Sequence, residues 1–297
     1  MSFNFFLMTE TSFHASYLVT KWVETFDGVA GFRGIIVREN PIPEETRNLR
    51  ELFHQKHHGQ TYLTNASMEL LREIYPDLSE TEQAMIRLFG VPAHSATYYP
   101  RTIFLGLNLN SPLAKQWLAE ACSGSDIPFL FVFLDQLLKP WWIERTDSQI
   151  INGHSAVLPY ARGMFAIENV AISQNIEVFK KAAGATVHYI DTGIDTGPII
   201  RAERLVDPFR FSSIWEQKGL IFTAVFNLLI EVAKDILDKP YTIPVGTCTD
   251  SKHRGPNFNS RDFTIEARKK AEEGYLRMKT LESAKQNGRL LVGLLGN

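Results

Sequence analysis

Short apolar runs alternate with stretches of helical periodicity along most of the chain. An unbroken apolar run of about four to eight residues is typical of a strand buried on both faces. Phe129–Leu134 is such a run, whereas Ser212–Leu237 repeats its apolar residues at the spacing of an amphipathic helix. This alternation predicts an α/β protein with a mostly parallel, twisted sheet flanked by helices.

The same pattern places the remaining elements. The expected strands are Phe3–Met8, Phe32–Val37, Thr102–Leu107, Phe129–Leu134, Gln149–Asn152, Ala185–Ile190 and Pro198–Leu205. Besides Ser212–Leu237, helices are expected over His14–Thr25 and from Ser111 to about Gly124. Ser111 supplies an N-cap for the latter, and Pro112 suits its first helical position.

A polar, irregular segment from about residue 39 to residue 100 interrupts the alternation. We expect two embedded helices in it, over residues 67–75 and 80–89. It also holds three histidines, His54, His57 and His58. Because no cysteine or carboxylate accompanies them at a metal-ligand spacing, an exposed loop is favoured over a metal site. We interpret the segment as an insertion or lid between strands.

Chain length limits the number of domains, and net charge limits the classes of binding partner. A chain of 297 residues accommodates two domains, or one domain with an appendage. The net charge of −2 gives no global positive field, which disfavours nucleic acid as a partner. Residues 251–297 carry ten basic and five acidic residues, with a charged helix expected over about 263–285. Mixed charges favour a solvated or dimer-forming face, so a homodimer stays open.

Cysteine content and the N-terminal stretch bear on the compartment. Cys122 and Cys248 are the only cysteines, which argues against a disulfide framework and suits a reducing environment. The first residues lack the basic and apolar regions of a signal peptide. The longest apolar run, Ile127–Leu134, is far shorter than the ~20 residues that span a bilayer. We therefore expect a cytoplasmic protein without a membrane partner.

Candidate chemistry lies in two segments that follow strands. Asn152 and His154 are two residues apart in extended chain, so their side chains share a face. The strand through His188 runs into a glycine-rich loop that carries Asp191 and Asp195. An amide that stabilises an oxyanion, an imidazole that moves protons and a carboxylate that tunes it suit acyl transfer. No nucleophile elbow or nucleotide-binding glycine motif follows a strand, so the nucleophile must come from the substrate.

These residues also carry a resemblance. The motif Asn152-x-His154-x-x-x-Leu158-Pro159-x-x-Arg162-Gly163 is followed by Val187-His188 and Asp191-x-Gly193-x-Asp195-x-Gly197-Pro198. Together they resemble the signature of the 10-formyltetrahydrofolate-dependent formyltransferases, over about residues 100–240. That family includes glycinamide ribonucleotide, methionyl-tRNA and amino-sugar N-formyltransferases. The resemblance implies a Rossmann-like catalytic domain over residues 1–240 and a helical extension over 241–297. It also implies 10-formyltetrahydrofolate as the donor and no metal.

The resemblance assigns roles to single residues. Asn152 resembles the asparagine that holds the formyl oxygen as it becomes an oxyanion. His154 resembles the histidine that stabilises this tetrahedral intermediate and moves protons, and Asp195 the aspartate that helps to keep it cationic. His188 stays open between a structural partner and a site residue. The pterin contacts implied are Leu134, Gln136, Leu137, Leu138, Val157, Ile190, Asp191, Thr192, Gly193 and Ile194.

Two departures from the family pattern limit which molecule can accept the formyl group. The loop Thr9-Glu10-Thr11-Ser12 lacks the Gly-Ser-Asn phosphate cradle of the glycinamide ribonucleotide enzymes. The tail is expected to be helical, unlike the β-rich domain of the methionyl-tRNA enzymes. The prediction is formyl transfer from 10-formyltetrahydrofolate to a primary amine of a small molecule. The alternatives are a 10-formyltetrahydrofolate hydrolase, an enzyme like methionyl-tRNA formyltransferase with tRNA as partner, and a non-catalytic folate-binding protein.

Overall fold

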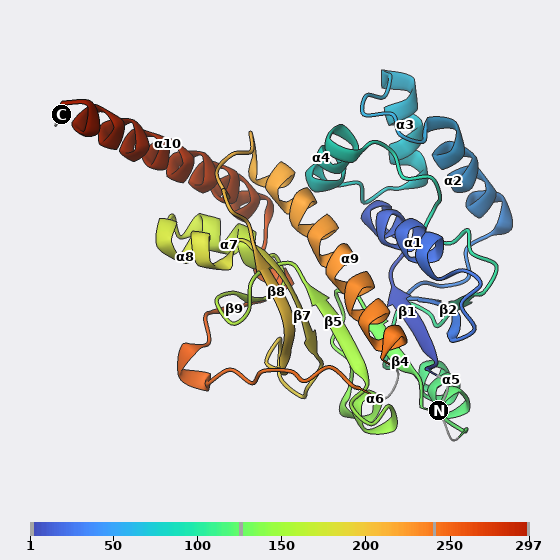
Figure 1. The fold of residues 1–297 in the computed structure, drawn as a ribbon. Coiled ribbons are helices and arrows are strands. Elements are labelled where there is room, and N and C mark those ends of the chain that lie inside the picture. Colours follow the sequence, from blue (N-terminus) through green and yellow to red (C-terminus); the bar gives the residue numbers. More distant parts are fainter. Residues whose placement is uncertain (1–2, 125–126, 240–241, 296–297) are drawn as a thin grey trace.

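A seven-stranded sheet forms the centre of the protein (Figure 1). The computed structural model describes residues 3–124, 127–239 and 242–295, with side chains up to residue 285. The strands are β1 (Phe5–Thr9), β2 (Phe32–Val37), β3 (Thr102–Phe104), β4 (Phe129–Val132), β5 (Ile150–His154), β7 (Gly184–Tyr189) and β8 (Ile199–Arg204). A second, two-stranded sheet pairs β6 (Arg162–Gly163) with β9 (Asn257–Phe258).

The central sheet has the order β3-β2-β1-β4-β5-β7-β8. It is parallel from β3 to β5, as the apolar runs predict. The strand β7 runs antiparallel to both of its neighbours, which the sequence pattern does not reveal. The pairing of β5 with β7 sets Asn152 directly opposite His188. Residues that are 36 positions apart in the chain therefore meet through backbone register.

Helices cover the sheet and form the insertion and the tail. They are α1 (Phe13–Phe26), α2 (Glu44–His57), α3 (Asn65–Ile74), α4 (Glu80–Phe89), α5 (Pro112–Ala121), α6 (Pro140–Arg145), α7 (Ala166–Ile172), α8 (Ile176–Ala182), α9 (Ile214–Asp238) and α10 (Ile265–Leu295). Ser111 caps α5 and Pro112 begins it, as predicted. Figure 1 shows α2, α3 and α4 grouped beside α1, and α10 running away from the body.

The apolar core has two parts, one on each face of the sheet. In β1, Leu7 belongs to the larger cluster with α1 and α9, and Met8 belongs to the smaller cluster with α5 and α6. In β4, Phe131 and Val132 divide in the same way. Side chains alternate between the faces of a strand, so a strand covered on both sides must be apolar throughout.

The insertion is more ordered than the sequence predicts. The exposed loop expected around His54, His57 and His58 is wrong for the first two, which are buried on the inner side of α2. Nδ1 of His54 lies 2.9 Å from the carbonyl oxygen of Pro92, and its Nε2 lies 2.8 Å from the Tyr75 hydroxyl. Burial lowers the pKa of His54 to about 4, so this side chain is a neutral core residue. Helix α2 escapes prediction because only Phe53, His54 and His57 are buried in it, while Leu49 and Leu52 are exposed.

The tail is helical, as predicted, but its first part folds back over the body. Residues 257 and 258 form β9 against β6, and Thr247 bridges to Ile199. The first half of α10 joins the main core through the buried side chains of Tyr275 and Met278. No helix in the described part of the chain combines the length and apolar character needed to cross a membrane.

Candidate active site

A cavity of about 1050 Å³ opens along the loops that follow β1, β4, β5 and β7. The predicted residues Asn152, His154, His188 and Asp195 all line it. In an α/β sheet, loops at the ends of strands are the usual place for a ligand site. The cavity is at the upper end of the volumes typical of small-molecule pockets, roughly 300–1000 Å³.

Backbone register brings Asn152 to His188. The Nδ2 of Asn152 lies 3.1 Å from Nε2 of His188. The other ring nitrogen of His188, Nδ1, donates to the carbonyl oxygen of Tyr189 at 2.8 Å, so Nε2 is the acceptor for the amide. His188 thus orients the Asn152 side chain. An amide group has two N–H donors, and the second has no partner among the described residues, which leaves it for a ligand.

His154 is held between a backbone carbonyl and a carboxylate. Its Nε2 donates to the Ala161 carbonyl oxygen at 3.0 Å, and its Nδ1 lies 3.5 Å from Oδ2 of Asp195. Burial lowers the pKa of His154, and the opposing effect of Asp195 does not outweigh it. The resting imidazole is therefore neutral rather than cationic, in contrast to the role that the resemblance implies for Asp195. With Nε2 protonated, Nδ1 is the basic nitrogen.

Asp195 is an ionised carboxylate in an unusual backbone conformation. Its φ of +49° lies in the left-handed region, which non-glycine residues seldom adopt. Oδ2 accepts a hydrogen bond from the backbone N–H of Gly163 at 2.7 Å. Burial alone would raise the pKa of Asp195, but His154, His188 and this N–H hold it well below its usual range. The carboxylate is thus ready to stabilise a cation that forms on His154.

The two segments predicted to bind the pterin face the cavity. All ten predicted residues except Val157 line it. Val157 is buried, and its N–H donates to the Ala182 carbonyl oxygen at 2.8 Å, so it is part of the core. Asp191 shapes its loop by accepting hydrogen bonds from the Gly193 N–H at 3.0 Å and the Thr196 hydroxyl at 2.7 Å.

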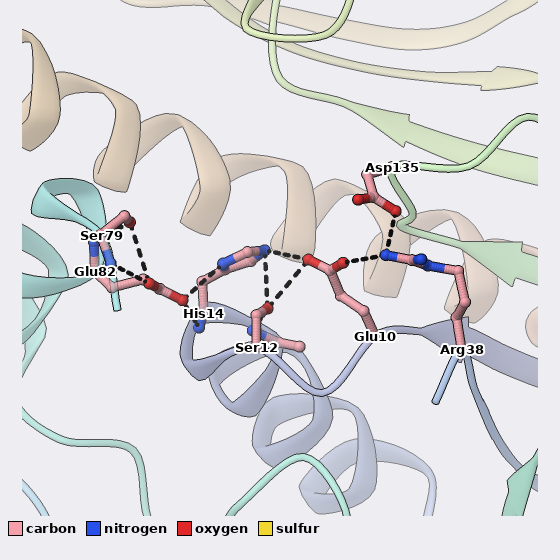
Figure 2. A network of polar contacts seen from close by, with 8 residues as sticks. Glu10, Ser12, His14, Arg38, Ser79, Glu82 and Asp135 are labelled. Carbon is pink, nitrogen blue, oxygen red and sulfur yellow. Dashed lines mark hydrogen bonds and ion pairs between the residues drawn. The ribbon is translucent and has the colours of Figure 1, made fainter. Parts of the chain in front are cut away.

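A second polar cluster in the same cavity escapes sequence analysis (Figure 2). His14 lies between two carboxylates, with Nδ1 3.0 Å from Glu82 and Nε2 3.1 Å from Glu10. Arg38 then bridges Glu10 at 3.3 Å and Asp135 at 2.5 Å. Burial would lower the pKa of His14, but the two carboxylates raise it to about 10. Burial would raise the pKa of Glu10, but its cationic partners lower it to about 2. His14 and the carboxylates of Glu10 and Glu82 are therefore charged near neutral pH, whereas burial raises the pKa of Asp135.

In this cluster, the carboxylate of Glu82 binds at the N-terminus of α1. Besides its ion pair, Glu82 accepts a hydrogen bond from the backbone N–H of His14 at 3.0 Å. Ser12 caps the same helix through the N–H of Ala15. The N–H groups at a helix N-terminus attract anions such as phosphate. Here Glu82, contributed by the insertion, already occupies that position.

The tail and α9 also contribute residues that the sequence did not mark. Phe258, Asn259, Ser260, Arg261 and Phe263 line the cavity. Lys218 of α9 forms a buried ion pair with Glu168 of α7 at 3.0 Å, and both side chains border the cavity. A positive tail and an isolated lysine are weak signals in a sequence, since most such residues are solvated.

Comparison with known proteins finds a match over the segment that carries Asn152, His154, His188 and Asp195. A family model described as formyl transferase covers residues 126–207. Phosphoribosylglycinamide formyltransferase of Bacillus subtilis is 46% identical over 65 residues, which are 22% of this chain and 31% of that protein. The Mycobacterium tuberculosis enzyme of the same name is 35% identical over 65 residues, 22% of this chain and 28% of that one. The matched stretch thus spans about a third of these relatives.

Two solved structures are also similar to this chain, at low sequence identity. A sugar N-formyltransferase from Shewanella sp. is 13% identical, with a TM-score of 0.50 over 93% of this chain and 87% of that one. An N-formyltransferase from Helicobacter canadensis, in complex with folinic acid and dTDP-3-aminofucose, is 13% identical. Its TM-score is 0.49 over 88% of this chain and 73% of that one. Asn152, His154 and Asp195 lie inside the segment, residues 126–207, over which this chain is similar to the formyl transferase family.

Proposed function

We propose that this protein transfers a formyl group from 10-formyltetrahydrofolate to a primary amine of a small-molecule acceptor. The observation that carries the proposal is the convergence of Asn152, His154 and Asp195 on one cavity, within the segment that matches the family model. An amide donor, a neutral imidazole and an ionised carboxylate form a set suited to acyl transfer between nitrogens.

The cavity offers different surroundings for the two substrates. We assign the donor's pterin to the segments Leu134–Leu138 and Ile190–Ile194, which border the catalytic residues. A further part of the wall is built by Glu10, His14 and insertion residues 75–82. We assign this part to the acceptor, with the insertion as an acceptor-side lid.

The residues support transfer without a covalent enzyme intermediate. The donor supplies an activated formyl group, which the acceptor amine attacks. The free N–H of Asn152 donates to the formyl oxygen as negative charge develops on it. Nδ1 of His154 takes the proton from the amine, and the imidazolium is stabilised by Asp195 at 3.5 Å. His154 then returns the proton to the folate nitrogen as the bond from that nitrogen to the formyl carbon breaks.

The acceptor named for the curated relatives does not suit this chain. Those enzymes are named for phosphoribosylglycinamide, which carries a phosphate. Here an incoming phosphate would meet Glu10 and Glu82 at the start of α1, where the N–H groups of His14 and Ala15 already have partners. We therefore propose an acceptor amine whose portion near α1 carries no phosphate.

The test follows tetrahydrofolate release from 10-formyltetrahydrofolate with and without a panel of amines, with the formamide product detected by mass spectrometry. Release that depends on an amine supports the proposal. Release without an amine would indicate hydrolysis, and binding without release would indicate a folate-binding protein. Full activity of a His154→Ala variant would contradict the assignment of the base.

A further inference from the structure

One short loop holds both members of the His154–Asp195 pair. The carbonyl oxygen of Ala161 accepts the hydrogen bond from His154, and two residues later the N–H of Gly163 donates to Asp195. The separation of the base from the carboxylate, 3.5 Å, therefore depends on the position of this loop. Whatever fixes the loop also fixes the geometry of the pair.

Arg162 lies between these two contacts and links three parts of the chain. Its Nη1 donates to the carbonyl oxygen of Ile194 at 3.1 Å. Its Nε and Nη2 both donate to the carbonyl oxygen of Gly255, at 3.3 and 3.2 Å. Ile194 directly precedes Asp195, whose left-handed backbone needs support from its surroundings. A planar guanidinium holds several acceptors in a fixed geometry, which a lysine cannot do.

The partner on the tail side is residues 255–263, which we name the closing segment. Its backbone runs close to the loop that contains Ala161, Arg162 and Gly163. The Gly255 N–H donates to the Pro159 carbonyl oxygen at 2.8 Å, and the Met164 N–H donates to the Phe258 carbonyl oxygen at 2.9 Å. A Cβ on Gly255 would lie 1.9 Å from the carbonyl oxygen of Tyr160, so the approach leaves no room for a side chain.

Aromatic stacking anchors the far end of the closing segment. The rings of Phe165 and Phe263 stack with centroids 4.4 Å apart and planes inclined by 15°. Between the two anchors, Phe258, Asn259, Ser260 and Arg261 line the cavity. The segment is thus fixed at both ends and contributes a wall to the site, although it lies in the part of the chain predicted as a helical extension.

We propose that Arg162 is a positioning residue that ties the Asp195 loop to the closing segment, so that the C-terminal tail sets the geometry of the His154–Asp195 pair. The inference rests on the proposed function, in which this pair moves the proton of the acceptor amine. Arg162 acts through backbone carbonyls on either side of the pair. The tail is then a part of the catalytic centre, and its docking completes the site.

The test compares full-length Arg162→Ala, Arg162→Lys and Arg204→Ala with the wild type. Arg204 is the matched control, because it contacts the same loop from the exposed side through Tyr160, at 3.1 Å from the hydroxyl. We expect kcat of Arg162→Ala to fall about 10- to 100-fold, since a misplacement of about 1 Å can cost 10²-fold. KM for the donor should stay unchanged. Arg162→Lys should recover part of kcat, and Arg204→Ala should match the wild type.

A second readout does not depend on activity. The imidazole of His154 is titrated by NMR in the ligand-free protein, where it senses Asp195, His188 and Lys218. Loss of the Asp195 contact should lower the pKa of His154 in Arg162→Ala, and lower it less in Arg162→Lys. Arg204→Ala should leave it unchanged.

The outcomes separate this inference from the proposed function. A wild type that transfers no formyl group to any amine would refute the function, and the titration would still test the link from Arg162 to His154. A folded Arg162→Ala variant with unchanged kcat and unchanged titration would overturn the positioning role. If Arg162→Ala does not fold, an Arg162→Lys variant with wild-type kcat and titration would overturn it as well.

Discussion

Replacement of Asp195 by asparagine should remove the charge that stabilises the His154 imidazolium while it preserves the shape of the loop. The asparagine carbonyl can still accept the hydrogen bond from Gly163, because only the charge and one acceptor oxygen change. A unit charge 3.5 Å away contributes about 4–5 kcal/mol at an effective dielectric constant of about 20. At about 1.4 kcal/mol per factor of ten, kcat should fall on the order of 10³-fold.

The pH profile gives this prediction a second signature. Asp195 opposes the effect of burial on His154, so its removal should lower the pKa of His154 further. The base must be neutral to accept a proton, and the acidic limb of the kcat/KM profile should therefore move to lower pH. Binding of 5-formyltetrahydrofolate, an unreactive analogue of the donor, should not change.

The assay is steady-state tetrahydrofolate release at saturating acceptor, with Asp235→Asn as the matched control. Asp235 of α9 forms an exposed ion pair with Arg201 of β8. Replacement of Asp235 should leave kcat near that of the wild type. If Asp195→Asn kept more than about a tenth of the wild-type kcat, an electrostatic role of the size worked out above would be refuted. An unchanged acidic limb would refute the assignment of His154 as its partner.

Three further predictions concern stability, each measured by urea unfolding. His14 has its pKa raised from 6.5 to about 10, so its contribution of up to about 5 kcal/mol is complete below pH 6.5 and lost as pH rises to 10. His14→Gln should abolish that dependence, and a parallel curve for wild type and variant would contradict the ion pairs. Glu168→Leu should cost about 3–5 kcal/mol because it leaves Lys218 buried without its partner, and adding Lys218→Met should recover most of it. Gly153→Ala should cost about 1–3 kcal/mol, since its Cβ would lie 2.4 Å from Val225, and Val225→Ala should relieve it.

Local patterns in the sequence were enough to predict most of the fold and to pick out candidate residues that the structure brings together in one cavity. The strand β2 has the predicted bounds. Helix α1 differs from its predicted range by one residue at each end, and α9 by two residues at its start and one at its end. Both are determined by apolar periodicity within one segment. Asn152 and His154 were found because two positions on one strand face must point the same way. Burial lowers the pKa of His154, and burial depends on neighbours that no local pattern displays.

The parts that escaped prediction depend on distant segments. His54 is buried only because Tyr75 and Pro92 come to it from elsewhere in the insertion. The cluster around His14 combines side chains from the loops after β1, β2 and β4 with one from α4. Nothing in the spacing of these residues marks them as neighbours. The closing segment was hidden for the same reason, since its partners lie about 90 positions earlier in the chain.

Because β5 pairs antiparallel with β7, the chemistry of this protein depends on the register between these strands as well as on residue identity. A slip of one position between these strands would reverse which face each side chain occupies. Asn152 and His154 would then face α9, and Gly153 alone would face the ligand. Any lengthening within either strand should thus inactivate the protein even with every catalytic residue present. Changes in the connection between them are tolerable only if Asn152 still faces His188 and the loop of Ala161 and Gly163 keeps its hydrogen bonds with His154 and Asp195.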